Sequence, residues 1–108
     1  MKTKNYNITG TTVTKILSAS DKVILDKPSM TISNLNASVA NVSVYYFKEN
    51  YIVAGNTTET YYVLKAFPMS GYRTLTLDKS DFAFGNKGFD LFLVLGASSE
   101  TVDVIVNY

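Results

Sequence analysis

The sequence predicts an all-β protein, a single antiparallel β-sandwich of about eight strands. Apolar and polar residues alternate with a period of two in one segment after another. Turn residues separate these segments at intervals of roughly 8–12 residues, as in sandwiches and barrels. No segment carries an apolar stripe with helical spacing over three turns. Eight strands fit a jelly-roll-like sandwich and an immunoglobulin-like one, and both remain open at this stage.

The strongest strand signal lies in residues 89–107. In residues 89–95 both faces carry large apolar groups and Asp90 is the single polar residue, which indicates a strand inside the protein. Residues 101–107 place valine at every second position. Because a short loop containing glycine, residues 96–100, joins the two runs, the pattern predicts a β-hairpin around which the remaining strands pack.

Residues 1–10 are polar, carry two lysines and end in glycine. We expect them to form an N-terminal arm outside the sandwich domain, which then covers residues 11–108. The arm is either a frayed terminus or a segment that becomes ordered against a neighbouring subunit, with Tyr6 and Ile8 as its anchors. Its basic start is not followed by an apolar run, so we expect no signal peptide.

The strands between the arm and the hairpin are bounded by turn residues. Pro28 ends one of them, because proline has no N–H to donate to a β-ladder. Residues 48–50 and 78–81 are polar and predict a turn and a bend, and residues 68–71 contain the proline and glycine typical of tight turns. The expected strands span residues 11–17, 22–25, 30–35, 39–47, 51–53, 58–67 and 73–77.

Composition bounds the function. The 108 residues form one domain, with 46% hydrophobic residues and a net charge of +1 from 10 basic and 9 acidic side chains. This balance favours neither nucleic acid nor an anionic membrane, and we expect neither as a partner. No segment approaches the ~20 apolar residues that span a bilayer. Cysteine and histidine are absent, which excludes disulfides, thiolate metal sites and the common catalytic triads.

Carboxylates are the remaining candidates for catalysis. Asp78 and Asp81 lie in the polar bend, where acidic residues usually cap backbone groups. Asp90 and Asp103 lie on adjacent strands of the expected hairpin, and we interpret them as structural. The sequence contains no calcium loop and no glycine-rich phosphate loop. We therefore expect a protein that is not an enzyme, with no catalytic residue, metal or cofactor.

Tyrosine is abundant, with eight residues. The pairs at 45–46 and 61–62 must each place one ring on either face of a sheet, because successive side chains alternate. The outward rings either shield the sheet or form a contact patch, since tyrosine offers large contact area with few rotamers to freeze. Such a patch suits a protein partner and also suits stacking against sugars. The candidate contact residues are Tyr6, Ile8, Tyr45, Tyr51, Tyr61 and Tyr72.

The second half of the chain resembles a known pattern. The match covers roughly residues 61–107. Residues 61–65, Tyr-Tyr-Val-Leu-Lys, are followed by Pro68 and Gly71, by Leu-Thr-Leu at residues 75–77 and by Phe82; it continues from Phe-Asp-Leu at residues 89–91 to Val-Asp-Val-Ile-Val at residues 102–106. This arrangement resembles small β-sandwich virion structural proteins of tailed bacteriophages, several of them from phages of aquatic bacteria.

The resemblance implies a virion structural protein made in the host cytoplasm, most simply a capsid decoration or cement protein. Its expected partner is the major capsid protein or another virion protein, and we expect a homo-oligomer in the particle. The alternatives are a neck or tail component, and a carbohydrate-binding module for attachment to the host.

Overall fold

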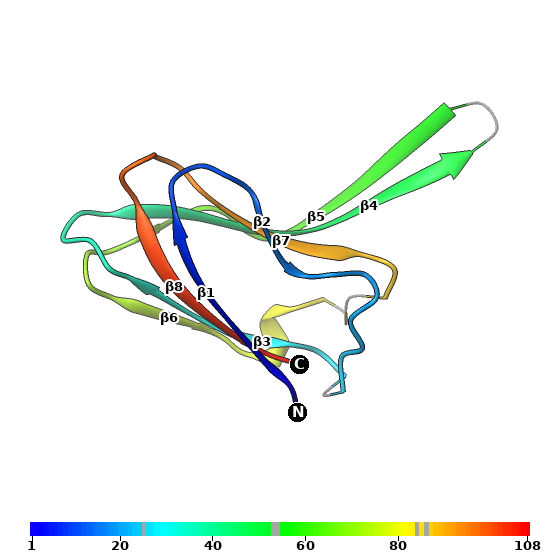
Figure 1. Ribbon diagram of the computed structural model, residues 1–108, viewed down its shortest axis with the longest axis horizontal. Coiled ribbons are helices and arrows are strands. Elements are labelled where there is room, and N and C mark those ends of the chain that lie inside the picture. The colour runs from blue at the N-terminus through cyan, green and yellow to red at the C-terminus, as the bar shows by residue number, and fades with distance from the viewer. Residues whose placement is uncertain (25, 53–54, 84, 86) are drawn as a thin grey trace.

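The computed structural model describes residues 1–24, 26–52, 55–83, 85 and 87–108, and the backbone alone of Tyr51, Ile52 and Asn56. It is built almost entirely of strands, arranged as two antiparallel four-stranded sheets that pack face to face (Figure 1). The predicted all-β sandwich of eight strands is confirmed. In chain order the elements are β1 (Thr3–Thr9), β2 (Thr14–Leu17), β3 (Ser29–Asn34), β4 (Ala40–Ile52), β5 (Gly55–Met69), β6 (Thr74–Leu77), the 3-10 helix η1 (Lys79–Asp81), β7 (Asp90–Leu95) and β8 (Thr101–Asn107).

The strand order is that of a jelly roll. One sheet runs β1-β8-β3-β6 and the other runs β2-β7-β4-β5, with every pair antiparallel. Among the described strands, β4 and β5 are the only consecutive pair that lies in one sheet; every other connection passes from one sheet to the other. Of the two topologies that the sequence left open, this order selects the jelly roll.

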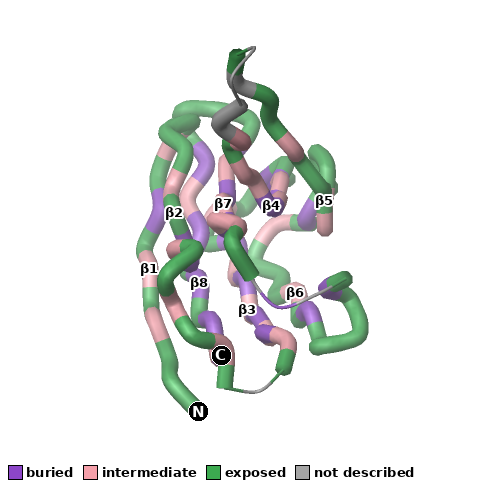
Figure 2. The backbone as a smooth tube through the Cα atoms, turned by 90° about the vertical axis from the view of Figure 1, so that its right-hand side faces the viewer, coloured by how far each residue is buried: buried purple, intermediate pink, exposed green. Residues whose placement is uncertain are grey.

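The core lies between the sheets and is filled by alternate residues of both (Figure 2). Leu91, Leu93 and Leu95 of β7 and the valines of β8 are all buried, as the alternation in the sequence predicted. At one end of the sandwich the buried ring of Tyr46 meets Phe82 edge-on, with ring centroids 6.4 Å apart. Burial raises the pKa of Tyr46 far above its ordinary value, so this hydroxyl stays protonated.

The β4–β5 hairpin extends beyond the sandwich (Figure 1). β7 pairs with β4 only from Val42 to Phe47, whereas β5 follows β4 as far as Ile52. We expected residues 48–50 to form a turn; they continue the strand instead. No core lies against this part of the hairpin, so polar residues can occupy both faces of an extended strand there.

The N-terminal arm is the first major correction. Residues 3–9 form β1, an edge strand that pairs with β8 over its whole length. Ile8 is buried in the core, and the hydroxyl of Tyr6 donates a hydrogen bond to the carbonyl oxygen of Ile16 at 2.7 Å. Lys4 forms a 2.8 Å ion pair with Asp21, and the hydrogen bond from Lys4 lowers the pKa of this carboxyl below its ordinary value. The segment is therefore part of the sandwich and not an arm.

The expected C-terminal hairpin is the second correction. β7 pairs with β2 and β4, whereas β8 pairs with β1 and β3 in the opposite sheet. The loop between them crosses the end of the sandwich and is fixed by Glu100. This buried carboxylate accepts hydrogen bonds from the backbone N–H groups of Gly96, at 3.0 Å, and Asn41, at 3.1 Å. Glu100 thus ties the loop to β4, which pairs with β7, and the chain then enters the other sheet as β8.

Smaller differences concern the ends of strands. The strand expected at residues 11–17 begins only at Thr14, and residues 22–24 are not a strand, while Leu25 lies outside the described residues. The short strand expected at residues 51–53 is the end of β4, although Val53 is also outside the described part. Pro68 belongs to β5, which tolerates proline because it is an edge strand.

The turn after β5 requires Gly71. A β-carbon added to Gly71 would lie 1.9 Å from the carbonyl oxygen of Ala37, closer than two atoms can approach. The buried amide of Asn34 holds the same corner, because its Nδ2 donates to the carbonyl oxygens of Ser38 and Met69. The loops at this end of the sandwich therefore pack backbone against backbone.

Candidate contact face

The outer face of the β2-β7-β4-β5 sheet carries a row of aromatic rings. Tyr62 of β5 lies directly opposite Tyr45 of β4, and Tyr45 lies opposite Phe92 of β7. We call these three residues the aromatic row. Their ring centroids are 5.3 Å apart between Tyr62 and Tyr45 and 5.6 Å apart between Tyr45 and Phe92. Phe47 contacts Phe92 edge-on at 6.1 Å and widens the row.

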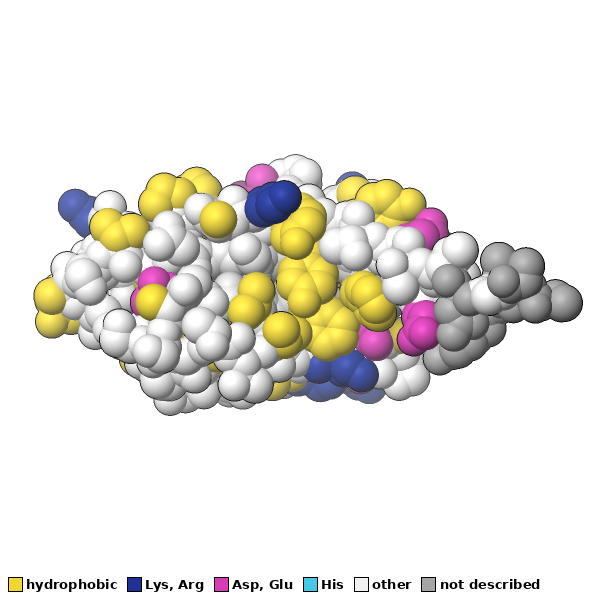
Figure 3. Space-filling view, turned by 90° about the horizontal axis from the view of Figure 1, so that it is seen from above, with side chains coloured by type: hydrophobic (Ala, Val, Ile, Leu, Met, Phe, Trp, Pro, Cys, Tyr) yellow, Lys and Arg dark blue, Asp and Glu magenta, His cyan; other side chains and the backbone are white. Residues whose placement is uncertain are grey.

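A lysine stands at each end of the aromatic row. The ammonium group of Lys65 lies 5.2 Å from the ring centre of Tyr62, and that of Lys15 lies 5.9 Å from the ring centre of Phe92. Figure 3 shows the result from outside: a band of hydrophobic side chains crosses the middle of this face, with basic side chains at both ends. Lys15 also approaches Asp90 at 3.6 Å, so the Lys15 end of the row is partly neutralised.

The bulges of β5 decide which side chains join the row. The register between β4 and β5 shifts twice, once on each side of Val44. At the shift between Val42 and Val44, Ala66 adopts a positive φ of 49°, and its N–H donates to the hydroxyl of Ser43 at 2.9 Å. Strict alternation would place Tyr62 and Lys65 on opposite faces, because they are three residues apart. The shift between Val44 and Tyr45 places one extra β5 residue between Tyr62 and Leu64, so Lys65 falls on the same face as Tyr62 and lies against its ring.

The row is held in place before any partner arrives. Tyr45 and Phe92 are partly buried, whereas Tyr62 is the most exposed of the three, at 50%. Each ring is packed against the next, so little side-chain freedom remains to be lost on binding. Burial, followed by the neighbouring hydroxyl of Tyr62, raises the pKa of Tyr45 above its ordinary value. The row is therefore an ordered, uncharged aromatic surface between two cations.

A second aromatic cluster lies on the opposite face of the same sheet, where the hairpin leaves the sandwich. Tyr61 packs against Phe89, with centroids 5.7 Å apart, and Lys48 lies 5.5 Å from the centre of the Phe89 ring. The hydroxyl of Tyr61 donates to Glu59 at 3.0 Å, and Glu59 also accepts from Asn50 at 2.9 Å. These hydrogen bonds lower the pKa of Glu59, and the bond to Glu59 raises that of Tyr61.

The structure separates the six predicted contact residues. Tyr45 is in the aromatic row and Tyr61 in the second cluster, while Tyr72 is 73% exposed in the β5–β6 turn at the far end of the sheet from the hairpin. Ile8 is buried in the core, and Tyr6 is partly buried against it, with its hydroxyl bonded to the carbonyl oxygen of Ile16. The side chain of Tyr51 lies outside the described part of the chain. Each tyrosine pair does place its rings on opposite faces, as predicted.

The predicted set missed Tyr62, Phe92, Lys15 and Lys65. They come from three strands, β5, β7 and β2, and the pairing of these strands with β4 brings them into one line. The signal available in the sequence was the alternation around residue 92, which marks an outward aromatic ring on an otherwise buried strand.

The carboxylates occupy structural positions. Asp90 and Asp103 do not approach each other, because β7 and β8 lie in different sheets. Asp81 accepts a hydrogen bond from the backbone N–H of Asp78 at 2.8 Å and caps η1, in agreement with the capping role predicted for this bend. The residues that the structure describes contain no group of three or more metal-binding side chains. They also contain no helix long and apolar enough to cross a membrane.

Comparison with known proteins adds little to the fold. No family model matches the chain, and no curated protein matches it in sequence. A solved structure described as the crystal structure of PirA matches with a TM-score of 0.46 and 14% sequence identity, over 98% of this chain and 92% of that chain.

Proposed function

We propose that this chain is a non-enzymatic structural protein of a bacteriophage particle, a capsid decoration or cement protein that attaches through the aromatic row. The observation that carries this function is the ordered line of Tyr62, Tyr45 and Phe92 across three neighbouring strands, between Lys65 and Lys15. Aromatic residues dominate the energetic centres of protein interfaces, because they bury large area at low entropic cost.

The chemistry of the row describes the surface that it fits. Apolar or aromatic side chains of the partner pack against the rings, and acidic side chains at the two ends pair with the lysines. Each lysine contributes modestly, since both ammonium groups remain in contact with water. In a particle that presents many equivalent sites, modest contacts suffice because avidity multiplies them.

The resemblance to virion proteins supports the particle as the setting, since its matching segment contains Tyr62, Lys65 and Phe92. The same surface would also serve a neck or tail component, which is present in fewer copies per particle than a capsid protein.

Carbohydrate binding is the second candidate, and one observation favours it. The rings of Tyr45 and Phe92 are tilted by only 32°, so together they offer a nearly continuous platform for sugar rings.

Particle composition decides the setting. We expect quantitative mass spectrometry of purified virions, from the phage that encodes this sequence, to find the chain in proportion to the major capsid protein. A copy number near that of a neck or tail ring would move the protein to those structures. Absence from washed virions would refute a structural role in the particle.

The aromatic row predicts a specific loss of attachment. In the double variant Tyr45→Ala and Tyr62→Ala, we expect binding to particles that lack the chain to fall at least about tenfold, because central aromatic residues carry most of an interface's energy. Cosedimentation of labelled protein with these particles measures the change. The matched control is Thr31→Ala with Thr76→Ala, on the outer face of the other sheet. Equal binding by both double variants would exclude the row as the contact.

The charged ends permit a second variant that leaves the rings intact. Replacing Lys15 and Lys65 by glutamine should weaken attachment and reduce its dependence on salt, because exposed charges are screened by ions. Replacing Lys79 and Lys87 by glutamine changes the net charge equally at other exposed positions. If the two pairs of substitutions reduce binding alike, the effect reflects net charge and not the row.

A glycan array tests carbohydrate binding, the second candidate function, with the same variants.

A further inference from the structure

The outer face of the β1-β8-β3-β6 sheet has a chemistry opposite to that of the aromatic row. Its outward residues are almost all small and polar: Thr3, Asn5, Asn7 and Thr9 on β1, Thr101, Asp103, Ile105 and Asn107 on β8, Ser29, Thr31 and Ser33 on β3, and Thr74 and Thr76 on β6. Cross-strand hydrogen bonds order this face, for example from Thr3 to Asn107 at 2.8 Å and between Ser33 and Thr74 at 3.0 Å. It is a flat layer of hydroxyl and amide groups.

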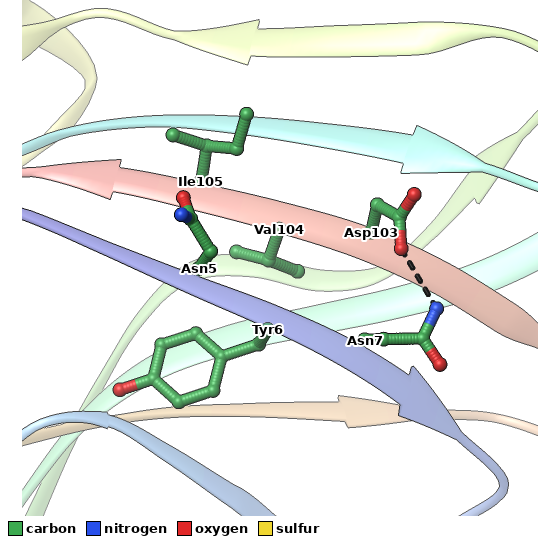
Figure 4. A pocket seen from close by; sticks show the side chains of 6 residues that line it. All are labelled: Asn5, Tyr6, Asn7, Asp103, Val104 and Ile105. Carbon is green, nitrogen blue, oxygen red and sulfur yellow. Dashed lines mark hydrogen bonds between the residues drawn. The ribbon is translucent and has the colours of Figure 1, made fainter.

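A shallow pocket of about 360 Å³ lies in this face, over β1 and β8. Asn5, Asn7, Asp103 and Ile105 line it, together with the strand segments around Tyr6 and Val104. Figure 4 shows Asn7 turned toward Asp103 and Asn5 beside Ile105, while the ring of Tyr6 points away from them. The pocket therefore combines a carboxylate, two amides and one aliphatic side chain.

Some polar groups of the pocket bond to each other, and others have no hydrogen-bond partner within the described residues. Nδ2 of Asn7 donates to Oδ1 of Asp103 at 2.7 Å, which fixes the orientation of both side chains. Within the described residues, Oδ2 of Asp103 accepts no hydrogen bond, and the side-chain amide of Asn5 makes none. Ile105 is 45% exposed on the outward face of β8 and is the one aliphatic side chain among the outward residues of this strand. An oriented acceptor, free amide groups and an apolar surface thus meet in one place.

We propose that this pocket binds a neutral saccharide. Two adjacent hydroxyls of a sugar ring would donate to Oδ2 of Asp103 and exchange hydrogen bonds with the Asn5 amide, while the C–H face of the ring packs on Ile105. The charge pattern argues against anionic ligands, because Asp103 is the one charged side chain among the outward residues of β1, β8, β3 and β6. The pocket lies on the sheet opposite the aromatic row, so a chain attached through the row would present it to the surroundings.

The test uses the complete chain labelled with ¹⁵N, titrated separately with glucose, galactose, mannose and N-acetylglucosamine to high millimolar concentration. We expect at least one of these sugars to shift the backbone resonances of Asn5, Asn7, Asp103 and Ile105 in a saturable way. Asp103→Asn should weaken that binding at least about tenfold, because hydrogen bonds to a charged acceptor are about twice as strong as neutral ones. Thr76→Ala, on the far strand of the same face, should leave it unchanged.

Three outcomes would overturn the assignment. The first is that none of the four sugars gives a saturable shift in a chain whose spectrum shows it to be folded. The second is that the shifts fall on Tyr45, Tyr62 and Phe92, which places sugar binding on the aromatic row. The third is that N-acetyl-lysine amide shifts the pocket residues while the sugars do not, which makes Asp103 a partner for cations. Particle attachment is measured with different variants, so either result stands without the other.

Discussion

Removal of residues 1–9 is expected to leave the chain unfolded or aggregated. The deletion takes away the whole of β1, including the buried side chain of Ile8 and the hydrogen bond from Tyr6 to Ile16. It also uncovers the edge of β8, which would then present unpaired backbone groups to other chains. Because domains of this size are stable by only about 5–15 kcal/mol, the loss of one strand in eight is not tolerated. Circular dichroism and size-exclusion chromatography of the truncated protein measure the outcome.

A control separates the strand from its outward side chains. Asn5→Ser keeps β1 and changes one exposed residue on its outer face, so it should unfold with nearly the same midpoint as the unmodified protein. A soluble, monomeric truncated protein with a cooperative unfolding transition would mean that β1 is dispensable. The N-terminal segment would then be an arm, as its polar composition had indicated.

Leu93→Ala is expected to lower the free energy of unfolding by about 2–4 kcal/mol, because large-to-small changes in a packed core lose both transfer energy and packing. Leu93 is completely buried at the centre of β7, with β2 on one side and β4 on the other. The neighbouring Val94 is the matched control, since it lies on the same strand and faces the other way. Val94→Ala should cost far less in chemical denaturation. Equal costs would show that the two faces of β7 are not differently buried.

Periodicity predicted the strands and their buried faces but not their partners. The valines of β8 and the leucines of β7 are buried as expected, because alternation reports which side of a strand faces the core. Pairing is a non-local property. Residues 96–100 have the composition of a hairpin loop, yet Glu100 ties them to Asn41 and the chain crosses to the other sheet. Nothing within the loop itself distinguishes these two outcomes.

The N-terminal strand was missed for a compositional reason. Its outward positions face solvent and hold threonine and asparagine, so only Tyr6 and Ile8 carried an apolar signal. A similar limit applies to the contact face. Tyr45 could be predicted as an outward ring, but Lys65 joins Tyr62 only because a bulge changes the alternation between them. Bulges depend on the pairing of two strands and leave little trace in either one.

The jelly-roll connections also set the order in which the chain can fold. Of the strands that the structure describes, only β4 and β5 are both consecutive and paired, so one hairpin can form early during synthesis. β1 is made first, yet its ladder partner β8 leaves the ribosome last of all the strands. Until β8 has been made, β1 has no ladder partner, and Tyr6 and Ile8 remain exposed. A sheet that pairs the first strand with the last can be completed only after all of the strands have been made.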